Sequence, residues 1–341
     1  MRHKRYLHIY ILVIGMLLVF AGGCSLLRTP APKPIPEIPG ADSAQESRRP
    51  NAAQPIPGVA QLDVNKYNME PTITVWVADK GYVDRMRLER YLEGVLAREM
   101  DPNWPIEALT AQAITSRTLT LHAMEAGTIM RLHHADVSTA KEELQAYAPQ
   151  LVNENVKEAV RRSRGQVLVY AGSLVHAIYS SCNGQVAATK EESFPKEIPT
   201  PTPYFQPVTD PCFQYAPEKE QSWMVKIPAS EVAAAVGYHG NPSDITILEK
   251  GASGRILYIG AGNKKVYGSD FRKTVGYDRL KSTLITEMTY DGQNFIFKGL
   301  GWGNGLGLCQ WGAYTLAQQG VSAEDIVKKF YVGAEIKKLW E

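Results

Sequence analysis

Glu99 is the side chain in this sequence best placed for acid–base chemistry. It ends a predicted helix over residues 89–99, just before a rigid Asp-Pro turn. Its apolar neighbours along the chain are Leu96, Met100 and Trp104. A carboxyl group held against apolar and aromatic side chains has a raised pKa and can act as a general acid near neutral pH. The alternative is that Glu99 caps the turn or pairs with Arg98 or Arg117.

The next predicted helix, residues 106–125, carries polar side chains on one face. Gln112 and Ser116 are four residues apart and therefore share that face, and Arg117 lies beside it. Such a face suits a sugar hydroxyl or an acetamido group, so we expect these residues to bind substrate. Two further candidates come from a polar loop that follows a predicted strand, Ser180 and Ser181.

A glycine-rich segment near the C-terminus offers another set of binding groups. Glycine recurs at positions 301, 303, 305 and 307, which permits positive φ and close backbone approach. Trp302 offers a stacking face, and Asn304 and Gln310 offer hydrogen bonds, a combination that suits carbohydrate. The segment is not a phosphate loop, because no Lys-Ser/Thr pair follows it. A purely structural turn is the alternative.

Three cysteines lie in the predicted globular part, Cys182, Cys212 and Cys309. A Cys182–Cys212 disulfide would close a proline-rich loop over residues 195–217, and this is the interpretation we favour. His176 and Cys182 could contribute to a zinc site, but two ligands are too few and no Cys-x-x-Cys pair is present. Free thiols are the third alternative. We therefore predict this disulfide, no metal and no cofactor.

The elements that must position these groups form an irregular mixture of helices and strands. Helical patterns lie at residues 89–99, 106–125, 153–164 and 230–236, and from 322 to 333. Strand patterns lie at residues 73–77, 166–170, 174–179, 245–259 and 284–297. No internal repeat and no regular βαβ alternation is visible, so we predict an α+β fold.

The N-terminus predicts an address outside the cytoplasm. Residues 1–23 combine a basic start, a short apolar run and a small-residue cleavage site before Cys24, the pattern of a lipoprotein signal peptide. Residues 24–62 contain eight prolines and predict a lipid-anchored tether, followed by a globular domain over 63–341. We expect attachment to the cell membrane or to the periplasmic face of an outer membrane. Ordinary secretion with a coincidental cysteine is the alternative.

The charge of the sequence argues against a nucleic-acid partner. The formal net charge is +2, and removal of residues 1–23 takes away three positive charges and no negative one, which leaves −1. The absence of two alternating α/β lobes argues against a solute-binding lipoprotein. Outside the cytoplasm, the cell wall is the obvious polymer for this protein to act on.

Taken together, these motifs resemble the stage II sporulation protein D/LytB family. The matching segments are Tyr91-Leu-x-Gly-Val95, Glu99-Met100, Trp104-Pro-x-Glu-Ala-Leu-x-Ala-Gln-Ala113, Arg117-Thr118, residues 253–255 and 280–283, and Gly301-Trp-Gly-x-Gly-x-Gly-x-x-Gln310. The resemblance covers roughly residues 70–340 and implies an SpoIID-like catalytic domain that acts on peptidoglycan, with sporulation as the process in the family's name.

The resemblance also implies a reaction. The better-understood members are lytic transglycosylases that cleave glycan strands stripped of stem peptides, between MurNAc and GlcNAc, and leave 1,6-anhydro-MurNAc ends. Glu99 matches their essential glutamate, which acts first as acid and then as base. The LytB branch implies the alternative of a non-catalytic peptidoglycan binder that enhances a cell-wall amidase. Three positions depart from the family pattern: Asn304 replaces a usual histidine, Cys309 stands where serine is usual, and Ala188 stands where some members have a third zinc ligand.

Overall fold

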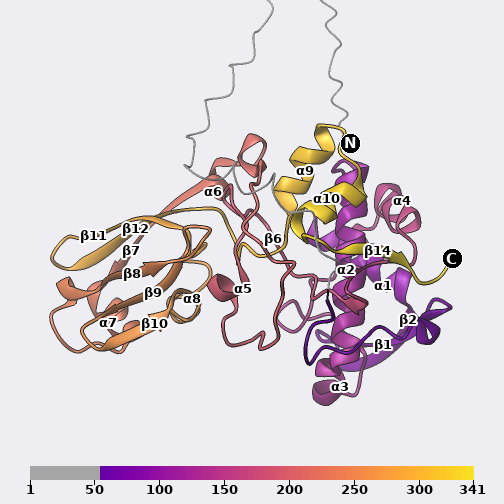
Figure 1. Ribbon diagram of the computed structural model, residues 1–341, viewed down its shortest axis with the longest axis horizontal. Helices are drawn as coiled ribbons and strands as arrows, with labels where there is room; N and C mark the ends of the chain where they lie inside the picture. Colours follow the sequence, from indigo (N-terminus) through magenta and orange to yellow (C-terminus); the bar gives the residue numbers. More distant parts are fainter. Residues whose placement is uncertain (1–53) are drawn as a thin grey trace, which may run out of the picture. The chain divides into compact units, whose positions relative to one another are not determined.

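The computed structural model describes residues 54–341 (Figure 1). The predicted signal peptide 1–23, the predicted lipidation site Cys24 and most of the predicted tether 24–62 lie outside the described residues. Within residues 54–341, no helix is both long enough and apolar enough to span a membrane.

The end of the predicted tether belongs to the folded part. Ile56 is buried in the main hydrophobic core. The backbone amide of Leu62 donates to the carbonyl of Gly172 (2.9 Å), and the Gln61 side chain donates to the Ser173 hydroxyl (3.0 Å). The folded region therefore begins earlier than predicted, because these residues find hydrogen-bond partners in a turn of the domain.

The described residues form an α+β fold, as predicted. The α-helices are α1 (Leu88–Glu99), α2 (Ile106–Ala126), α3 (Thr128–His133), α4 (Glu154–Arg162), α5 (Lys190–Ser193), α6 (Glu218–Gln221), α7 (Ala229–Val236), α8 (Gly268–Val275), α9 (Gln310–Gln318) and α10 (Ala323–Phe330). The strands are β1 (Thr72–Val77), β2 (Tyr82–Arg87), β3 (Val137–Ser138), β4 (Gln166–Tyr170), β5 (Ser173–Leu174), β6 (Tyr179–Ser180), β7 (Ser222–Pro228), β8 (Thr246–Lys250), β9 (Ile256–Ala261), β10 (Lys264–Tyr267), β11 (Ile285–Tyr290), β12 (Asn294–Leu300), β13 (Leu308–Cys309) and β14 (Glu335–Lys338).

The strands are divided among several small sheets. Their orders are β2-β1-β3, β14-β4-β5, β10-β9-β8, β11-β12-β7 and β13-β6. The single strand predicted over residues 174–179 is wrong, because its two ends pair in different sheets. β5 pairs with β4, whereas β6 pairs in parallel with β13, with Tyr179 opposite Leu308 and Ser180 opposite Cys309.

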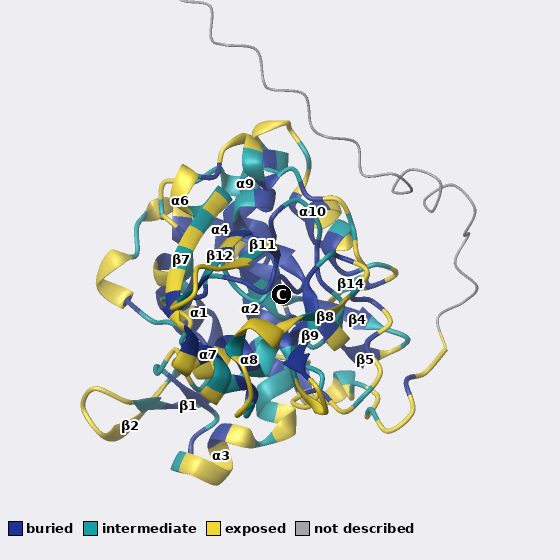
Figure 2. Ribbon diagram, turned by 90° about the vertical axis from the view of Figure 1, so that its left-hand side faces the viewer, coloured by how far each residue is buried: buried dark blue, intermediate teal, exposed yellow. Residues whose placement is uncertain are grey.

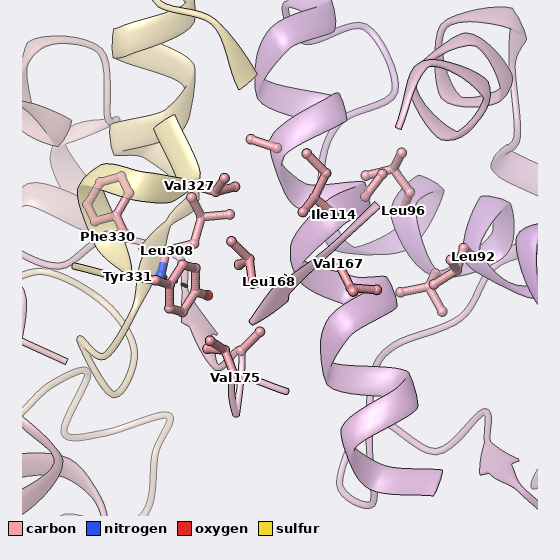
Figure 3. Packing of buried hydrophobic residues seen from close by; sticks show 14 of the residues in the cluster. Leu92, Leu96, Ile114, Val167, Leu168, Val175, Leu308, Val327, Phe330 and Tyr331 are labelled. Atoms are coloured by element: carbon pink, nitrogen blue, oxygen red, sulfur yellow. Dashed lines mark hydrogen bonds between the residues drawn. The ribbon is translucent and has the colours of Figure 1, made fainter. Parts of the chain in front are cut away.

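Helix α2 lies at the centre of the main hydrophobic core. Every residue from Ala108 to Thr118 is buried, and α2 packs against α1, α4, α9, α10 and β4. Its many alanines and threonines are small enough for neighbours to approach from several sides. Figure 3 shows core side chains from α1, α2, β4 and α10, among them Leu96, Ile114, Leu168 and Phe330. Figure 2 shows the contrast with α3, where exposed residues dominate.

A second hydrophobic core lies within residues 222–297. Strands β7, β9 and β12 and helices α7 and α8 supply its side chains. Its aromatic members are Phe271, Phe295 and Phe297. These elements are drawn in orange in Figure 1. The chain thus buries apolar surface in two clusters, and the first of them carries the residues around Glu99.

A buried ion pair joins α2 to α1. Arg117 Nη2 lies 2.6 Å from Glu89 Oε2, with side-chain exposures of 0% and 7%. Glu89 Oε1 also accepts hydrogen bonds from the Trp340 indole (2.9 Å) and the Gly165 amide (3.2 Å), while Arg117 donates to the Gln166 carbonyl (3.1 Å). A buried ion pair is tolerated when its remaining donors and acceptors are satisfied in this way.

Substitution Glu89→Gln should lower the free energy of unfolding of the full chain by about 3–5 kcal/mol, because Arg117 would keep its buried charge without a counter-charge. Urea unfolding followed by tryptophan fluorescence measures this difference. The matched control is Glu154→Gln, whose side chain is 88% exposed and should change the stability by less than about 1 kcal/mol. Equal effects of the two substitutions would contradict the prediction.

Candidate active site around Glu99

Glu99 is the last residue of α1 and lines a cavity of about 990 Å³. Other walls come from separate elements, including His122 of α2, Tyr179 of β6 and Asn304 of the glycine-rich segment. A smaller cavity of about 290 Å³ also has Asn304 in its wall. The two cavities share four lining residues, Phe194, Glu197, Tyr277 and Asn304. They therefore form one extended hollow with Glu99 in its larger part.

Burial is the largest influence on the Glu99 carboxyl and raises its pKa above the usual range. The Ala146 amide donates to Oε1 (2.7 Å), which favours the ionised form and lowers the pKa. The Tyr179 hydroxyl, which donates to the Gln145 side chain (3.3 Å), is near enough to the Glu99 carboxyl to lower its pKa as well. The Gln310 side chain donates to the Glu99 backbone carbonyl (3.1 Å) and fixes the end of α1. The raised pKa agrees with the expectation from the apolar neighbours. A half-buried carboxyl with a raised pKa at a cavity wall is suited to general acid catalysis.

The glycine-rich segment lies directly against the loop that follows β6. Cys182 and Trp302 exchange two backbone hydrogen bonds of 2.9 Å. Gly307 has a φ of 66°, and a Cβ atom there would collide with the carbonyl oxygen of Ile178. The close backbone approach predicted for these glycines is confirmed, and its partner is another segment of the same chain.

Asn304 and Gln310 are the residues of this segment that the structure brings to the surroundings of Glu99. Asn304 Nδ2 donates to the Tyr179 carbonyl (3.2 Å), and its Oδ1 accepts from the Leu306 amide (2.7 Å). Asn304 therefore holds the loop in place and also reaches the cavity wall. Gln310 is buried and acts on the Glu99 backbone.

Ser180, Ser181 and Trp302 were predicted to contact substrate, but each of them contacts another residue of this protein. Ser180 is buried, and its hydroxyl accepts an amide hydrogen bond from that segment (3.1 Å). Ser181 donates to Glu220 (2.5 Å), and the Lys281 ammonium lies 4.0 Å from the centroid of the Trp302 ring. None of the three is among the described residues that line the larger cavity.

The predicted binding face of α2 is wrong. Gln112 and Ser116 are fully buried and hydrogen-bond to each other (3.0 Å), and Arg117 is committed to Glu89. Packed helices cover this part of α2, so the polar groups satisfy one another. The part of α2 that faces the cavity comes later, at Leu119, His122, Ala123 and Ala126. Their spacing of three, four and seven residues is the helical signal that could have found it.

A stacked histidine pair in the cavity wall was not predicted. The rings of His122 and His176 lie 4.3 Å apart with an angle of 7° between their planes. Burial lowers the pKa of both, that of His176 to about 3, so the two imidazoles are neutral at neutral pH. They offer hydrogen bonds to a substrate without adding charge. Among residues 54–341, no group of three metal-binding side chains includes His176, so the His176–Cys182 zinc alternative does not fit.

The predicted Cys182–Cys212 disulfide is not present in the structure. The two sulfurs are free thiols 3.2 Å apart. Cys309, which ends β13, is also buried and its thiol lies within hydrogen-bonding reach of both. The prediction paired Cys182 with Cys212 and left Cys309 unpaired. The pairing of β6 with β13 brings Cys309 to the other two thiols, and no local sequence pattern indicates this contact.

Comparison with known proteins gives this site a family context. The sequence profile described as stage II sporulation protein matches residues 78–170, a range that contains Glu99 and His122. An uncharacterized protein of Brachyspira hyodysenteriae is 30% identical over 259 residues, which cover 74% of this chain and 67% of the relative. The chain belongs to the SpoIID/LytB family.

Relatives within this family carry two different names. Stage II sporulation protein D of Bacillus amyloliquefaciens is 26% identical over 279 residues, 78% of this chain and 79% of that protein. The amidase enhancer of Bacillus subtilis is 26% identical over 294 residues, 72% of this chain but 40% of that protein. The similarity to both extends well beyond the 78–170 match and over most of this SpoIID/LytB chain.

The raised pKa of Glu99 predicts a pH-dependent cost in stability. Below the ordinary glutamate pKa of about 4.3, Glu99 is protonated in both states and costs nothing. As the pH rises through the higher pKa of the folded state, the fold must bury a charge and loses stability. Glu99→Gln should therefore melt at a higher temperature than wild type at about pH 8 and at the same temperature at about pH 4.

Differential scanning fluorimetry of the two full chains across this pH range measures the effect. The control is Glu335→Gln, an exposed position on β14, which should follow the wild-type curve. A Glu99→Gln chain that melts below wild type at the higher pH would show that burial does not dominate at this carboxyl.

Proposed function

We propose that this protein is a peptidoglycan lytic transglycosylase in which Glu99 acts first as acid and then as base. The observation that carries the proposal is a half-buried carboxyl, that of Glu99, whose pKa is raised in the wall of a large cavity. A volume of about 990 Å³ is at the upper end of the range for ligand sites, in keeping with a segment of a polymer rather than one sugar ring.

In the proposed reaction, protonated Glu99 gives its proton to the glycosidic oxygen between MurNAc and GlcNAc, and the bond from that oxygen to the muramyl C1 breaks. The Glu99 carboxylate then takes the proton of the muramyl 6-hydroxyl. The O6 atom forms the new bond to C1 and closes the 1,6-anhydro ring. The proton that left Glu99 is thereby replaced, and no water is consumed. One carboxyl suffices, unlike in the two-carboxylate hydrolases.

The neighbours of Glu99 support each half of this cycle. Burial favours the protonated form that the first step requires, while the Ala146 amide and Tyr179 favour the carboxylate that the second step requires. A group that must act first as acid and then as base needs both kinds of influence. The neutral rings of His122 and His176 add no positive charge near Glu99, and the nearby Arg98 guanidinium lowers its pKa by less than the hydrogen bonds do.

The proposed location follows from the predicted leader. A signal peptide over residues 1–23, a lipid on Cys24 and a proline-rich tether would hold the domain outside the cytoplasm, beside the wall. A membrane-bound enzyme on a tether of limited reach would cut only glycan close to that membrane.

The proposal predicts that Glu99→Gln lowers the release of 1,6-anhydro-MurNAc ends from denuded glycan by about 10²–10⁴-fold, the usual contribution of a general acid. Mass spectrometry of products formed by the full chain measures this release. Binding to purified sacculi should stay unchanged, because glutamine keeps the size and hydrogen-bonding capacity of the side chain. Glu335→Gln should release product at the wild-type rate. Full activity of the Glu99→Gln chain would remove Glu99 from the mechanism.

A second candidate function is that of a non-catalytic enhancer of a cell-wall amidase. Asn304 favours it, because an amide stands where the family usually has a histidine and cannot carry a proton, and one relative is named amidase enhancer. This function predicts that wild type and Glu99→Gln stimulate a purified amidase equally on sacculi and release no anhydro ends. Anhydro ends from wild type alone would reject it.

A further inference from the structure

Four buried side chains outside the Glu99 cavity converge from separate segments of the chain. Cys182 follows β6, Cys212 begins a short 3-10 helix with Asp210 just before it, and Cys309 ends β13. All four are buried. The ligand atoms of Asp210, Cys212 and Cys309 lie within 4.8 Å of one another, and the Cys182 and Cys212 sulfurs are 3.2 Å apart. We call these four residues the thiol cluster.

The Asp210 side chain has a hydrogen-bond partner for only one of its two carboxyl oxygens. One oxygen, Oδ1, accepts the Cys212 amide (3.0 Å). The other, Oδ2, is buried without a hydrogen-bond partner, although Asp210 is only 5% exposed. An unsatisfied buried carboxylate oxygen is costly in free energy. The three thiols beside it are the groups with which it would share a cation.

The Cys309 sulfur faces two backbone N–H donors. Its Sγ accepts backbone amides from Asn183 (3.2 Å) and Gly312 (3.3 Å), the second of them at the N-terminus of α9. Helix N-termini stabilise thiolates, and such N–H contacts orient sulfur ligands around a metal. Arg255 is fully buried and donates to the Asn183 carbonyl (2.6 Å). It lies within electrostatic reach of Asp210, Cys212 and Cys309 and supplies a positive counter-charge.

We propose that Cys182, Cys212, Cys309 and Asp210 bind one Zn²⁺ ion in a closed, four-coordinate structural site. Three sulfurs and one carboxylate oxygen are a ligand set that selects zinc over the harder divalent cations. Zn–S bonds of about 2.3 Å place tetrahedral sulfurs roughly 3.8 Å apart; the Cys182 and Cys212 sulfurs are closer, at 3.2 Å, and would have to move apart slightly, while the ligand atoms of Asp210, Cys212 and Cys309 lie within 4.8 Å of one another. Binding would release the thiol protons to solvent.

The proposed site would fix two residues that contact Glu99. Tyr179, which contacts the Glu99 carboxyl, lies three residues before Cys182, and Gln310, which holds the Glu99 carbonyl, directly follows Cys309. A metal that joins Cys182 to Cys309 therefore fixes two neighbours of the catalytic group. The site is independent of the His176–Cys182 pair, because His176 is stacked on His122.

The test is metal analysis of the full chain purified with a reductant and without chelators. Inductively coupled plasma mass spectrometry should find one zinc per chain. Cys212→Ser and Cys309→Ser should each lower the zinc content at least about tenfold, because a thiolate ligand is lost. Asp210→Asn should weaken binding of added Zn²⁺ in a competition titration. The matched control, His176→Ala, should keep the wild-type zinc content.

Two further readings do not depend on glycan cleavage. Co²⁺ added to metal-free protein should give thiolate-to-cobalt charge-transfer absorption that is lost in Cys309→Ser, and a chelator should lower the melting temperature of wild type. The proposal is overturned if the reduced wild-type chain holds no zinc and binds no Co²⁺. It is equally overturned if peptide mapping finds a Cys182–Cys212 disulfide in the native protein, or if His176→Ala loses the metal while Cys309→Ser keeps it. If the serine variants do not fold, the measurements on wild type, Asp210→Asn and His176→Ala still test the proposal.

Discussion

The parallel pairing of β6 with β13 is the contact on which the candidate site depends. It joins residues near 180 to residues near 308 and continues in the Cys182–Trp302 backbone pair. The approach is so close that side chains at several glycines would collide with the facing segment, as at Gly307 against Ile178. One short pairing thereby delivers Tyr179 and Gln310 to Glu99. It also brings Cys309 to the other two cysteines, so the acid group and the thiol cluster share one structural cause.

Helix α1 carries a buried and a half-buried glutamate with opposite chemical properties. Glu89 meets the guanidinium of Arg117 and two further N–H donors, so its charge is compensated inside the core. Glu99, at the other end of the same helix, receives weaker neutral hydrogen bonds while burial raises its pKa. The first environment holds α1 against α2 permanently, and the second leaves a proton available at the cavity wall. Compensation of charge, rather than burial alone, separates the structural carboxylate from the proposed acid.

The polar groups of α2 follow the same logic along a single helix. In its first half, Gln112, Ser116 and Arg117 satisfy one another or α1 under a cover of packed helices. In its second half, His122 lies at the cavity wall, where its neutral ring stacks on His176. The cover of neighbouring helices therefore decides which polar residues of α2 are structural and which can meet a substrate.

The sequence by itself determined the α+β character, the ends of α1 and α2, the acid candidate Glu99 and the close approach at the glycines. These depend on local periodicity, turn residues and the apolar neighbours of one carboxyl, all of which can be read over a few positions. Tertiary structure alone decided that the Gln112 face is covered, that His122 and His176 stack, and that three cysteines meet rather than two. Cys182 and Cys212 are 30 residues apart, and Cys309 reaches them only through a two-residue strand pairing. Contacts between such distant segments depend on packing of the whole domain, which leaves no local pattern around any of the residues concerned.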